Sequence, residues 1–127
     1  MARILIVDDD EMERRLLKSG LERTHDVVFA PNGRVAEDIV ERDTIDLVVT
    51  DLVMPEVNGL RLIRDLRDRG EMMPIIAISG AAAEQLDLAE DFGAELTLMK
   101  PIDLDEFIRA VEQCLSRRAI GWEPDRT

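Results

Sequence analysis

The sequence predicts an α/β fold, a doubly wound (βα)5 sandwich in which a parallel five-stranded sheet carries helices on both faces. Three observations predict this class. Short apolar runs alternate with segments of helical spacing along the chain. The runs are continuously apolar, which is typical of parallel strands buried on both faces. Finally, a chain of 127 residues suits one domain that buries roughly two-thirds of the surface its unfolded form exposes.

The strands are expected where the apolar runs lie, at residues 4–7, 26–30, 45–50, 75–79 and 96–99. After each run, apolar residues recur at helical spacing with charged residues between them, which predicts an amphipathic helix. The third helix ends before Gly70 and Pro74, and the fourth ends at Gly93. In chain order, the apolar stripes are Met12, Leu16, Leu17 and Leu21; Val35, Ala36, Ile39 and Val40; Leu62, Ile63 and Leu66; Leu86, Ala89 and Phe92 after Ala81-Ala82-Ala83; and Leu104, Phe107, Ile108, Val111 and Leu115.

Each of four strands ends in a chemically distinctive residue. Asp8 and Asp9 follow the first strand, Asp51 follows the third, Ser79 ends the fourth, and Lys100 follows the fifth. In an open parallel sheet, ligands bind outside the carboxyl ends of the strands, at the point where the strand order reverses. The strand order 2-1-3-4-5 brings Asp8, Asp9 and Asp51 closest together, and for this reason we favour it.

The bulk composition limits the function. The net charge of -12 argues against nucleic acid or an anionic membrane as a direct partner, because Lys and Arg drive phosphate binding. The single cysteine, Cys114, has no internal disulfide partner and is interpreted as a small buried residue. No stretch reaches the ~20 apolar residues of a membrane span. These features predict a cytoplasmic protein.

The three strand-end aspartates predict a divalent cation site. Adjacent carboxylates at the end of a buried strand repel one another unless a cation neutralises them. Mg²⁺ prefers such oxygen ligands, and the chain has no His or Cys cluster for zinc. Asp10 and Glu11 are interpreted instead as the acidic start of the first helix.

Asp51 is the candidate nucleophile. A carboxylate can attack phosphorus when a metal screens the incoming anion and donors hold its oxygens. Ser79 and Lys100 are such donors, and Lys100 is one of only two lysines beside 14 arginines. Pro101 restricts the backbone of Lys100 and permits a cis bond, so it can direct the lysine across the sheet.

Across about residues 2–116 the chain resembles the receiver domain of two-component response regulators (CheY-like). The resemblance rests on four motifs in order: Ile4-Leu5-Ile6-Val7-Asp8-Asp9-Asp10; Val48-Val49-Thr50-Asp51-Leu52-Val53-Met54-Pro55 with Asn58-Gly59; Ile78-Ser79-Gly80; and Met99-Lys100-Pro101. It implies a flavodoxin-like fold. We expect a receiver domain at 1–118 and a short tail at 119–127.

The resemblance also implies roles for the site residues. Asp51 would accept a phosphoryl group from a histidine kinase or histidine phosphotransfer protein. Asp9 and Asp51 would bind Mg²⁺ directly with the backbone carbonyl of Val53, and Asp8 would act through a metal-bound water. Ser79 and Lys100 would hold phosphoryl oxygens.

Transmission of the signal is the least typical part of the sequence. In the family, the Ser or Thr moves toward the phosphate and an aromatic residue on the fifth strand turns inward. Thr97 occupies that position here, and the chain has no Tyr. Ser79 and Thr97 are therefore the expected switch residues. The downstream protein target is expected on the face formed by the fourth helix, fifth strand and fifth helix, in a monomer or weak homodimer.

Two alternatives remain open. A small Mg²⁺-dependent phosphatase of the haloacid dehalogenase type also uses a strand-end Asp, but its D-x-D-x-[TV] motif has Met12 at the last position here. The second alternative is a receiver-like module that binds proteins without being phosphorylated. The chain is either a single-domain regulator or the receiver of a longer protein.

Overall fold

Strands and helices alternate through the residues that the computed structural model describes, which are 1–54, 58–80 and 83–119. The elements are β1 (Arg3–Val7), α1 (Glu11–Ser19), β2 (Asp26–Ala30), α2 (Gly33–Arg42), β3 (Leu47–Asp51), α3 (Gly59–Asp68), β4 (Ile75–Ser79), α4 (Ala83–Phe92), β5 (Leu96–Met99) and α5 (Leu104–Ala119).

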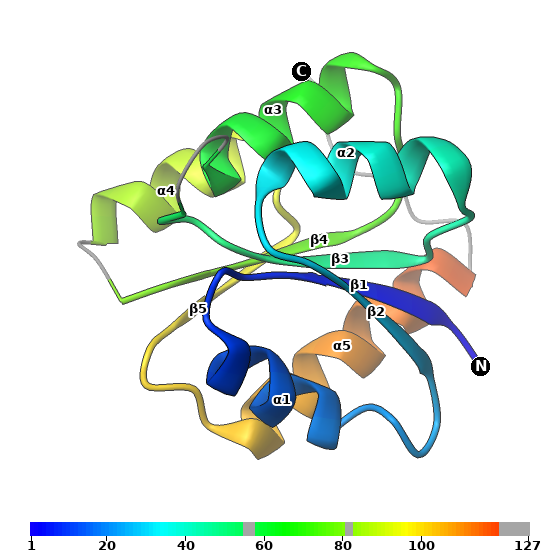
Figure 1. Ribbon diagram of the computed structural model, residues 1–127. Coiled ribbons are helices and arrows are strands. Elements are labelled where there is room, and N and C mark those ends of the chain that lie inside the picture. The colour runs from blue at the N-terminus through cyan, green and yellow to red at the C-terminus, as the bar shows by residue number, and fades with distance from the viewer. Residues whose placement is uncertain (55–57, 81–82, 120–127) are drawn as a thin grey trace.

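The sheet has the strand order β2-β1-β3-β4-β5, and every neighbouring pair is parallel. Helices α1 and α5 cover one face, while α2, α3 and α4 cover the other (Figure 1). The predicted doubly wound α/β fold and its strand order are confirmed. The order reverses between β1 and β3, and these strands pair from Ile4 with Leu47 to Val7 with Thr50.

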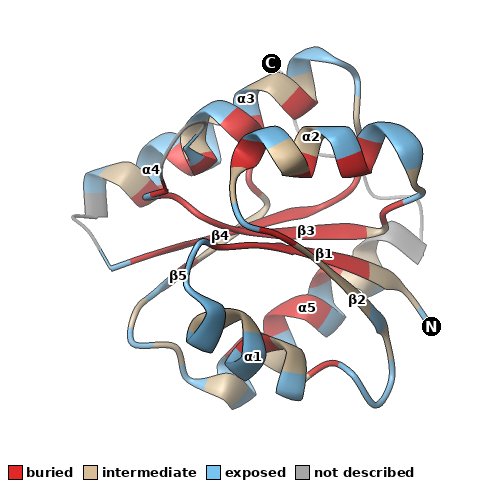
Figure 2. Cartoon of the chain, viewed as in Figure 1, coloured by how far each residue is buried: buried red, intermediate tan, exposed pale blue. Residues whose placement is uncertain are grey.

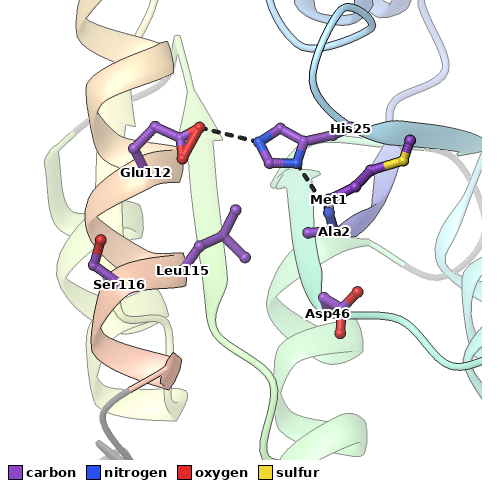
Figure 3. Close-up of a pocket in the computed structure, with 7 residues that line it drawn as sticks. All are labelled: Met1, Ala2, His25, Asp46, Glu112, Leu115 and Ser116. Atoms are coloured by element: carbon purple, nitrogen blue, oxygen red, sulfur yellow. Dashed lines mark hydrogen bonds and ion pairs between the residues drawn. The ribbon is translucent and has the colours of Figure 1, made fainter.

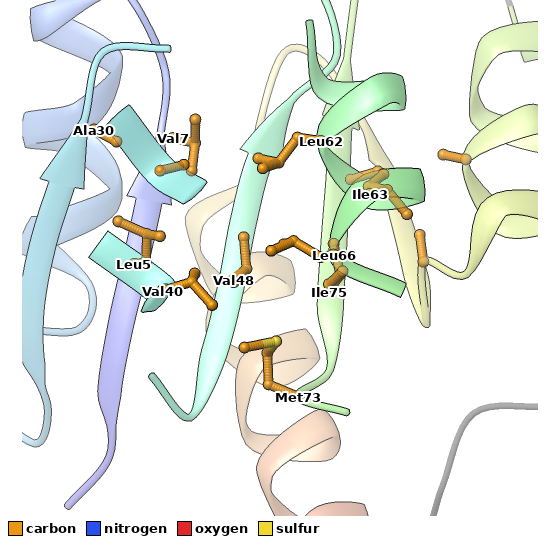
Figure 4. Close-up of a cluster of buried hydrophobic side chains, with 14 of the residues drawn as sticks. Leu5, Val7, Ala30, Val40, Val48, Leu62, Ile63, Leu66, Met73 and Ile75 are labelled. Atoms are coloured by element: carbon orange, nitrogen blue, oxygen red, sulfur yellow. The ribbon is translucent and has the colours of Figure 1, made fainter. Parts of the chain in front are cut away.

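Two apolar cores lie on opposite faces of the sheet. Leu5 and Val7 of β1 belong to the core beneath α2, α3 and α4, whereas Ile4 and Ile6 belong to the core beneath α1 and α5. Figure 4 shows the first core, where Leu62 and Leu66 of α3 pack over the strands. The central strands are buried along their length (Figure 2), because successive side chains point into opposite cores. This double burial explains why the strands are continuously apolar.

Side-chain caps define where several helices begin. Asp10 is the N-cap of α1, and its carboxylate accepts the backbone N–H groups of Met12 and Glu13, as predicted. Asn32 and Asn58 cap α2 and α3 in the same way. These caps satisfy backbone donors that lack a partner within the helix.

Some boundaries differ from the prediction. β3 begins at Leu47, although Ile45 is as buried as a strand residue. Ile45 packs in a core, but the register with β1 begins at Leu47. Asp46 bonds Arg3 through its backbone N–H and its carboxylate, each at 2.8 Å. Helix α1 ends at Ser19, before Leu21. Residues 81 and 82 of the predicted fourth helix and 120–127 of the predicted tail lie outside the described residues, and the boundary at 118 stays a prediction.

Candidate functional site

The carboxyl ends of β1 and β3 bring three aspartates together. Asp8 and Asp9 follow β1, and Asp51 is the last residue of β3. Because Val7 pairs with Thr50, the residues that come next in each strand are neighbours. One carboxylate oxygen from each aspartate lies within 4.8 Å of the other two. This oxygen-only donor set fits a hard divalent cation such as Mg²⁺.

Asp51 is held by two different donors. It is 7% exposed. Its Oδ2 accepts a hydrogen bond from Lys100 Nζ at 2.9 Å, and its Oδ1 accepts the backbone N–H of Val53 at 3.2 Å. The carboxylate is therefore fixed in orientation at the edge of the sheet.

Lys100 reaches Asp51 from two strands away. β4 separates β3 from β5, and the N–H of Lys100 donates to the carbonyl of Ser79 at 3.0 Å. The Lys100–Pro101 bond is cis. Burial alone would lower the pKa of Lys100, but the hydrogen bond and charge of Asp51, with the charges of Asp8 and Glu13, raise it above its usual value. The ammonium is therefore charged at neutral pH.

Asp8 is buried without a full counter-charge. It is 2% exposed, and its Oδ1 accepts the Asp10 N–H at 2.9 Å. Burial raises the pKa of this carboxyl to about 6, the charges of Asp51 and Glu13 add to the rise, and the Asp10 bond and Lys100 oppose it. Asp9, in contrast, is exposed. The cluster thus carries negative charge that a cation would neutralise.

Of the remaining predicted residues, Ser79 and Val53 lie beside Asp51, whereas Thr97 lies outside the cluster. Ser79, fully buried, ends β4 beside the strand that carries Asp51. Val53 contributes its N–H to Asp51, and its side chain is exposed. Thr97 lies in the middle of β5 and is not part of the cluster; its hydroxyl faces Glu90 of α4 at 3.5 Å.

Three residues to which the sequence analysis assigned no role lie at the site. Glu13 of α1 lies 4.0 Å from Lys100 Nζ. Arg14, the next residue of the same helix, donates from Nη1 to the carbonyl of Asp8 at 2.7 Å. Gly59 lies so close to Asp51 that a Cβ there would overlap the Asp51 carbonyl and approach Leu52 Cα to 2.8 Å. Only Gly59 had a sequence signal, the Asn58-Gly59 pair.

A pocket lies at the amino end of the sheet, opposite the aspartate cluster (Figure 3). His25 Nδ1 accepts the Ala2 N–H at 3.1 Å, so the ring proton sits on Nε2, which faces Glu112 Oε1 at 3.0 Å. This arrangement ties the start of β1 to α5.

Cys114 is buried in α5, and burial raises the pKa of its thiol to about 12. The structure thus supports its interpretation as a packing residue.

None of the described helices has the length and apolar character that crossing a membrane requires.

Comparisons with known proteins agree with this architecture. The family model described as the response regulator receiver domain matches residues 4–112. An uncharacterized 14.6 kDa protein of Leptolyngbya boryana is 42% identical over 120 residues, which cover 89% of this chain and 90% of that protein.

A probable transcriptional regulatory protein of Picosynechococcus is 36% identical over 126 residues, which cover 92% of this chain and 50% of that protein. This chain thus spans half the length of that relative. The receiver domain of the Francisella response regulator 1452 superimposes with a TM-score of 0.87 at 27% identity, over 93% of this chain and 99% of that one.

Proposed function

Because the chain belongs to the response regulator receiver domain family of two-component signalling, we propose that Asp51 accepts a phosphoryl group from a histidine kinase or a histidine phosphotransfer protein. One observation carries the proposal. The Asp51 carboxylate is buried, is bonded to Lys100 at 2.9 Å, and shares a cluster of oxygen ligands with Asp8 and Asp9. A carboxylate so placed is a nucleophile beside a donor for the phosphoryl oxygens.

The transfer proceeds by displacement at phosphorus. An oxygen of Asp51 forms a bond to phosphorus as the bond between phosphorus and the donor's imidazole nitrogen breaks, and the electron pair leaves with that nitrogen. The product is an aspartyl phosphate. Lys100 then holds a phosphoryl oxygen. The hydroxyl of Ser79, on the neighbouring strand, is the second candidate hydrogen-bond donor to the phosphoryl group. The domain catalyses its own modification chiefly by positioning these groups.

The acidic cluster fits Mg²⁺. Asp9 and Asp51 would bind it directly with the carbonyl of Val53, and Asp8 would act through a metal-bound water. When bound, the cation neutralises charge on the transferring phosphoryl group. The raised pKa of Asp8 supports this assignment, because it reflects a buried carboxylate that lacks a sufficient counter-charge.

The output would pass through Ser79 and Thr97 to the face of α4, β5 and α5. Phosphorylation would draw Ser79 toward the new oxygens and shift the population toward an active form. Thr97 connects β5 to Glu90 of α4, and Leu88 and Met99 are exposed on these elements. We propose this face as the contact for a downstream protein. The cytoplasmic location and the monomer or weak homodimer remain predictions.

Incubation with acetyl phosphate and Mg²⁺, followed by intact-mass measurement, tests the proposal. We expect wild type and Asp38→Asn, an exposed control on α2, to gain one phosphoryl group, and Asp51→Asn to gain none. A wild type that gains no phosphoryl group contradicts the proposal and favours a module that is not phosphorylated. Steady release of phosphate from simple esters without labelling favours the phosphatase alternative.

A further inference from the structure

The ammonium of Lys100 lies within 4.0 Å of two carboxylates that belong to different elements. Nζ donates to Asp51 Oδ2 of β3 at 2.9 Å, and Glu13 Oε1 of α1 lies 4.0 Å from the same nitrogen. Lys100 is the one ammonium that contacts Asp51 among the ion pairs of residues 1–54, 58–80 and 83–119. Its charge is therefore shared between the phosphoryl acceptor and a second anion.

The position of Glu13 is fixed by the start of α1. Its backbone N–H donates to the N-cap carboxylate of Asp10 at 3.3 Å, and its side chain lies 4.0 Å from Lys100 Nζ. The side chain of Glu13 is 20% exposed. Glu11, two residues earlier in the same turn, is 66% exposed and pairs with Arg15 at 2.8 Å. The two glutamates thus have the same chemistry but very different surroundings.

We propose that Glu13 is a positioning residue that determines phosphodonor specificity through Lys100. This inference rests on the proposed function of Asp51. By sharing the ammonium, Glu13 reduces the positive charge that Lys100 offers to an incoming phosphoryl group. Its own negative charge also opposes the entry of an anion. Small, highly charged phosphodonors depend on this attraction to bind, whereas a phosphorylated protein gains additional affinity from its docking contacts.

Neutralising Glu13 therefore favours small anionic donors. We expect Glu13→Gln to lower the half-saturating concentration of acetyl phosphate about two- to fivefold at saturating Mg²⁺, the range typical of a partly exposed ion pair. The maximal rate changes little, because Glu13 does not touch the reacting atoms. This decrease in the half-saturating concentration becomes smaller at high salt. It is also smaller for phosphoramidate, which carries less negative charge than acetyl phosphate.

Glu11→Gln is the matched control, since it removes the same charge from the same helical turn at a distance from Lys100. We expect its half-saturating concentration to equal that of wild type. A half-saturating concentration in Glu13→Gln equal to that of wild type overturns the inference. An equal decrease in both variants also overturns it, because it would reveal only a general effect of net charge.

A spectroscopic measurement tests the contact independently of phosphorylation. The chain has two lysines, Lys18 and Lys100, so ¹⁵N-lysine labelling gives two side-chain ammonium signals, and Lys18→Arg assigns them. We expect Glu13→Gln to shift the Lys100 signal and leave the Lys18 signal in place, whereas Glu11→Gln shifts neither. A stationary Lys100 signal overturns the inference.

The two measurements separate this inference from the proposed function. If wild type accepts no phosphoryl group, the proposed function fails and the specificity role of Glu13 fails with it, even if the Lys100 signal shifts. If wild type is phosphorylated but Glu13→Gln behaves as wild type does, only the role of Glu13 fails.

Discussion

The two ends of the sheet differ in how their charged side chains are arranged. At the carboxyl end, Asp8, Asp9 and Asp51 cluster together, and the ammonium of Lys100 is shared between Asp51 and Glu13. At the amino end, Arg3 pairs with Asp26 at 3.3 Å and Arg117 with Glu95 at 3.2 Å, and the ring of His25 contacts Glu112 at 3.0 Å.

This difference separates stability from function within one architecture. The pairs at the amino end join β1, β2 and α5 and the start of β5, so they hold elements together. The carboxyl end keeps an excess of negative charge in a buried setting, which opposes folding but attracts a cation. We expect substitutions at the amino end to destabilise the fold, and neutral substitutions in the acidic cluster to stabilise it while removing function.

The largest effect is expected from Arg67→Ala at the amino end. The guanidinium of Arg67 donates to the carbonyls of Glu71, Met73 and Gly93 at 2.7–3.1 Å, which ties α3 to the start of β4 and the end of α4. Its removal leaves these acceptors without that donor. We expect the free energy of unfolding in urea to fall by about 3 kcal/mol.

Arg64→Ala, at an exposed position of the same helix, provides the control and should change stability by less than about 0.5 kcal/mol. Arg67→Ala should still accept a phosphoryl group at temperatures where it is folded. Equal stabilities of the two variants would contradict a structural role for the amino end.

Asp8→Asn is expected to act in the opposite direction. In wild type without divalent cations, the folded-state pKa of about 6 exceeds the ordinary 3.8 of an aspartate. The ionised carboxylate therefore opposes folding at neutral pH, and we expect the variant to be more stable at pH 7 by about 2 kcal/mol.

The pH dependence has a definite sign. Between the two pKa values the folded state binds more protons than the unfolded state, so the contribution of Asp8 to stability is present at low pH and is lost as pH rises toward about 6. The difference between variant and wild type should thus be small near pH ~4 and grow toward pH ~6. A variant less stable than wild type at pH 7 would show that Asp8 supports the fold.

His25→Ala should have a moderate effect. It removes the acceptor for the Ala2 N–H and the partner of Glu112, and we expect a loss of about 1 kcal/mol in the free energy of unfolding. Glu112→Gln retains an oxygen acceptor for Nε2–H and should remain close to wild type. An equal loss in both variants would show that the glutamate charge, not the acceptor, is what matters.

Thr97→Val should have the smallest effect. The hydroxyl makes one long contact, 3.5 Å from Glu90, so we expect thermal unfolding to report a change below about 0.5 kcal/mol. A loss above 1.5 kcal/mol, which is large for a single neutral hydrogen bond, would indicate that Thr97 supports the α4–β5 face more strongly than this contact suggests.

Much of the fold follows from the sequence, because burial on both faces leaves a clear apolar pattern. The strands at 26–30, 75–79 and 96–99 have the predicted bounds. Ile45 shows the limit of this reasoning: it is buried like a strand residue but precedes the ladder. An apolar pattern reports burial, whereas strand bounds depend on backbone pairing.

The site followed from strand ends, and the omissions of Glu13 and Arg14 have one cause. Asp8, Asp9, Asp51 and Lys100 could be placed together because parallel strands end at the same edge of a sheet. Glu13 and Arg14 could not, because their roles depend on how α1 is rotated over the sheet. Helical periodicity predicts which face is apolar, but not which polar residue at its border reaches the site.

The dependence of stability on Mg²⁺ tests the contrast between the two ends most directly. We expect the free energy of unfolding of wild type and of Asp38→Asn to rise equally with Mg²⁺, by about 2.7 kcal/mol at a hundred times the Kd. The free energy of unfolding of Asp51→Asn should rise far less with Mg²⁺. A wild type whose stability does not respond to Mg²⁺, or an Asp51→Asn variant that responds as strongly as wild type, would contradict a cation site at the carboxyl end of the sheet.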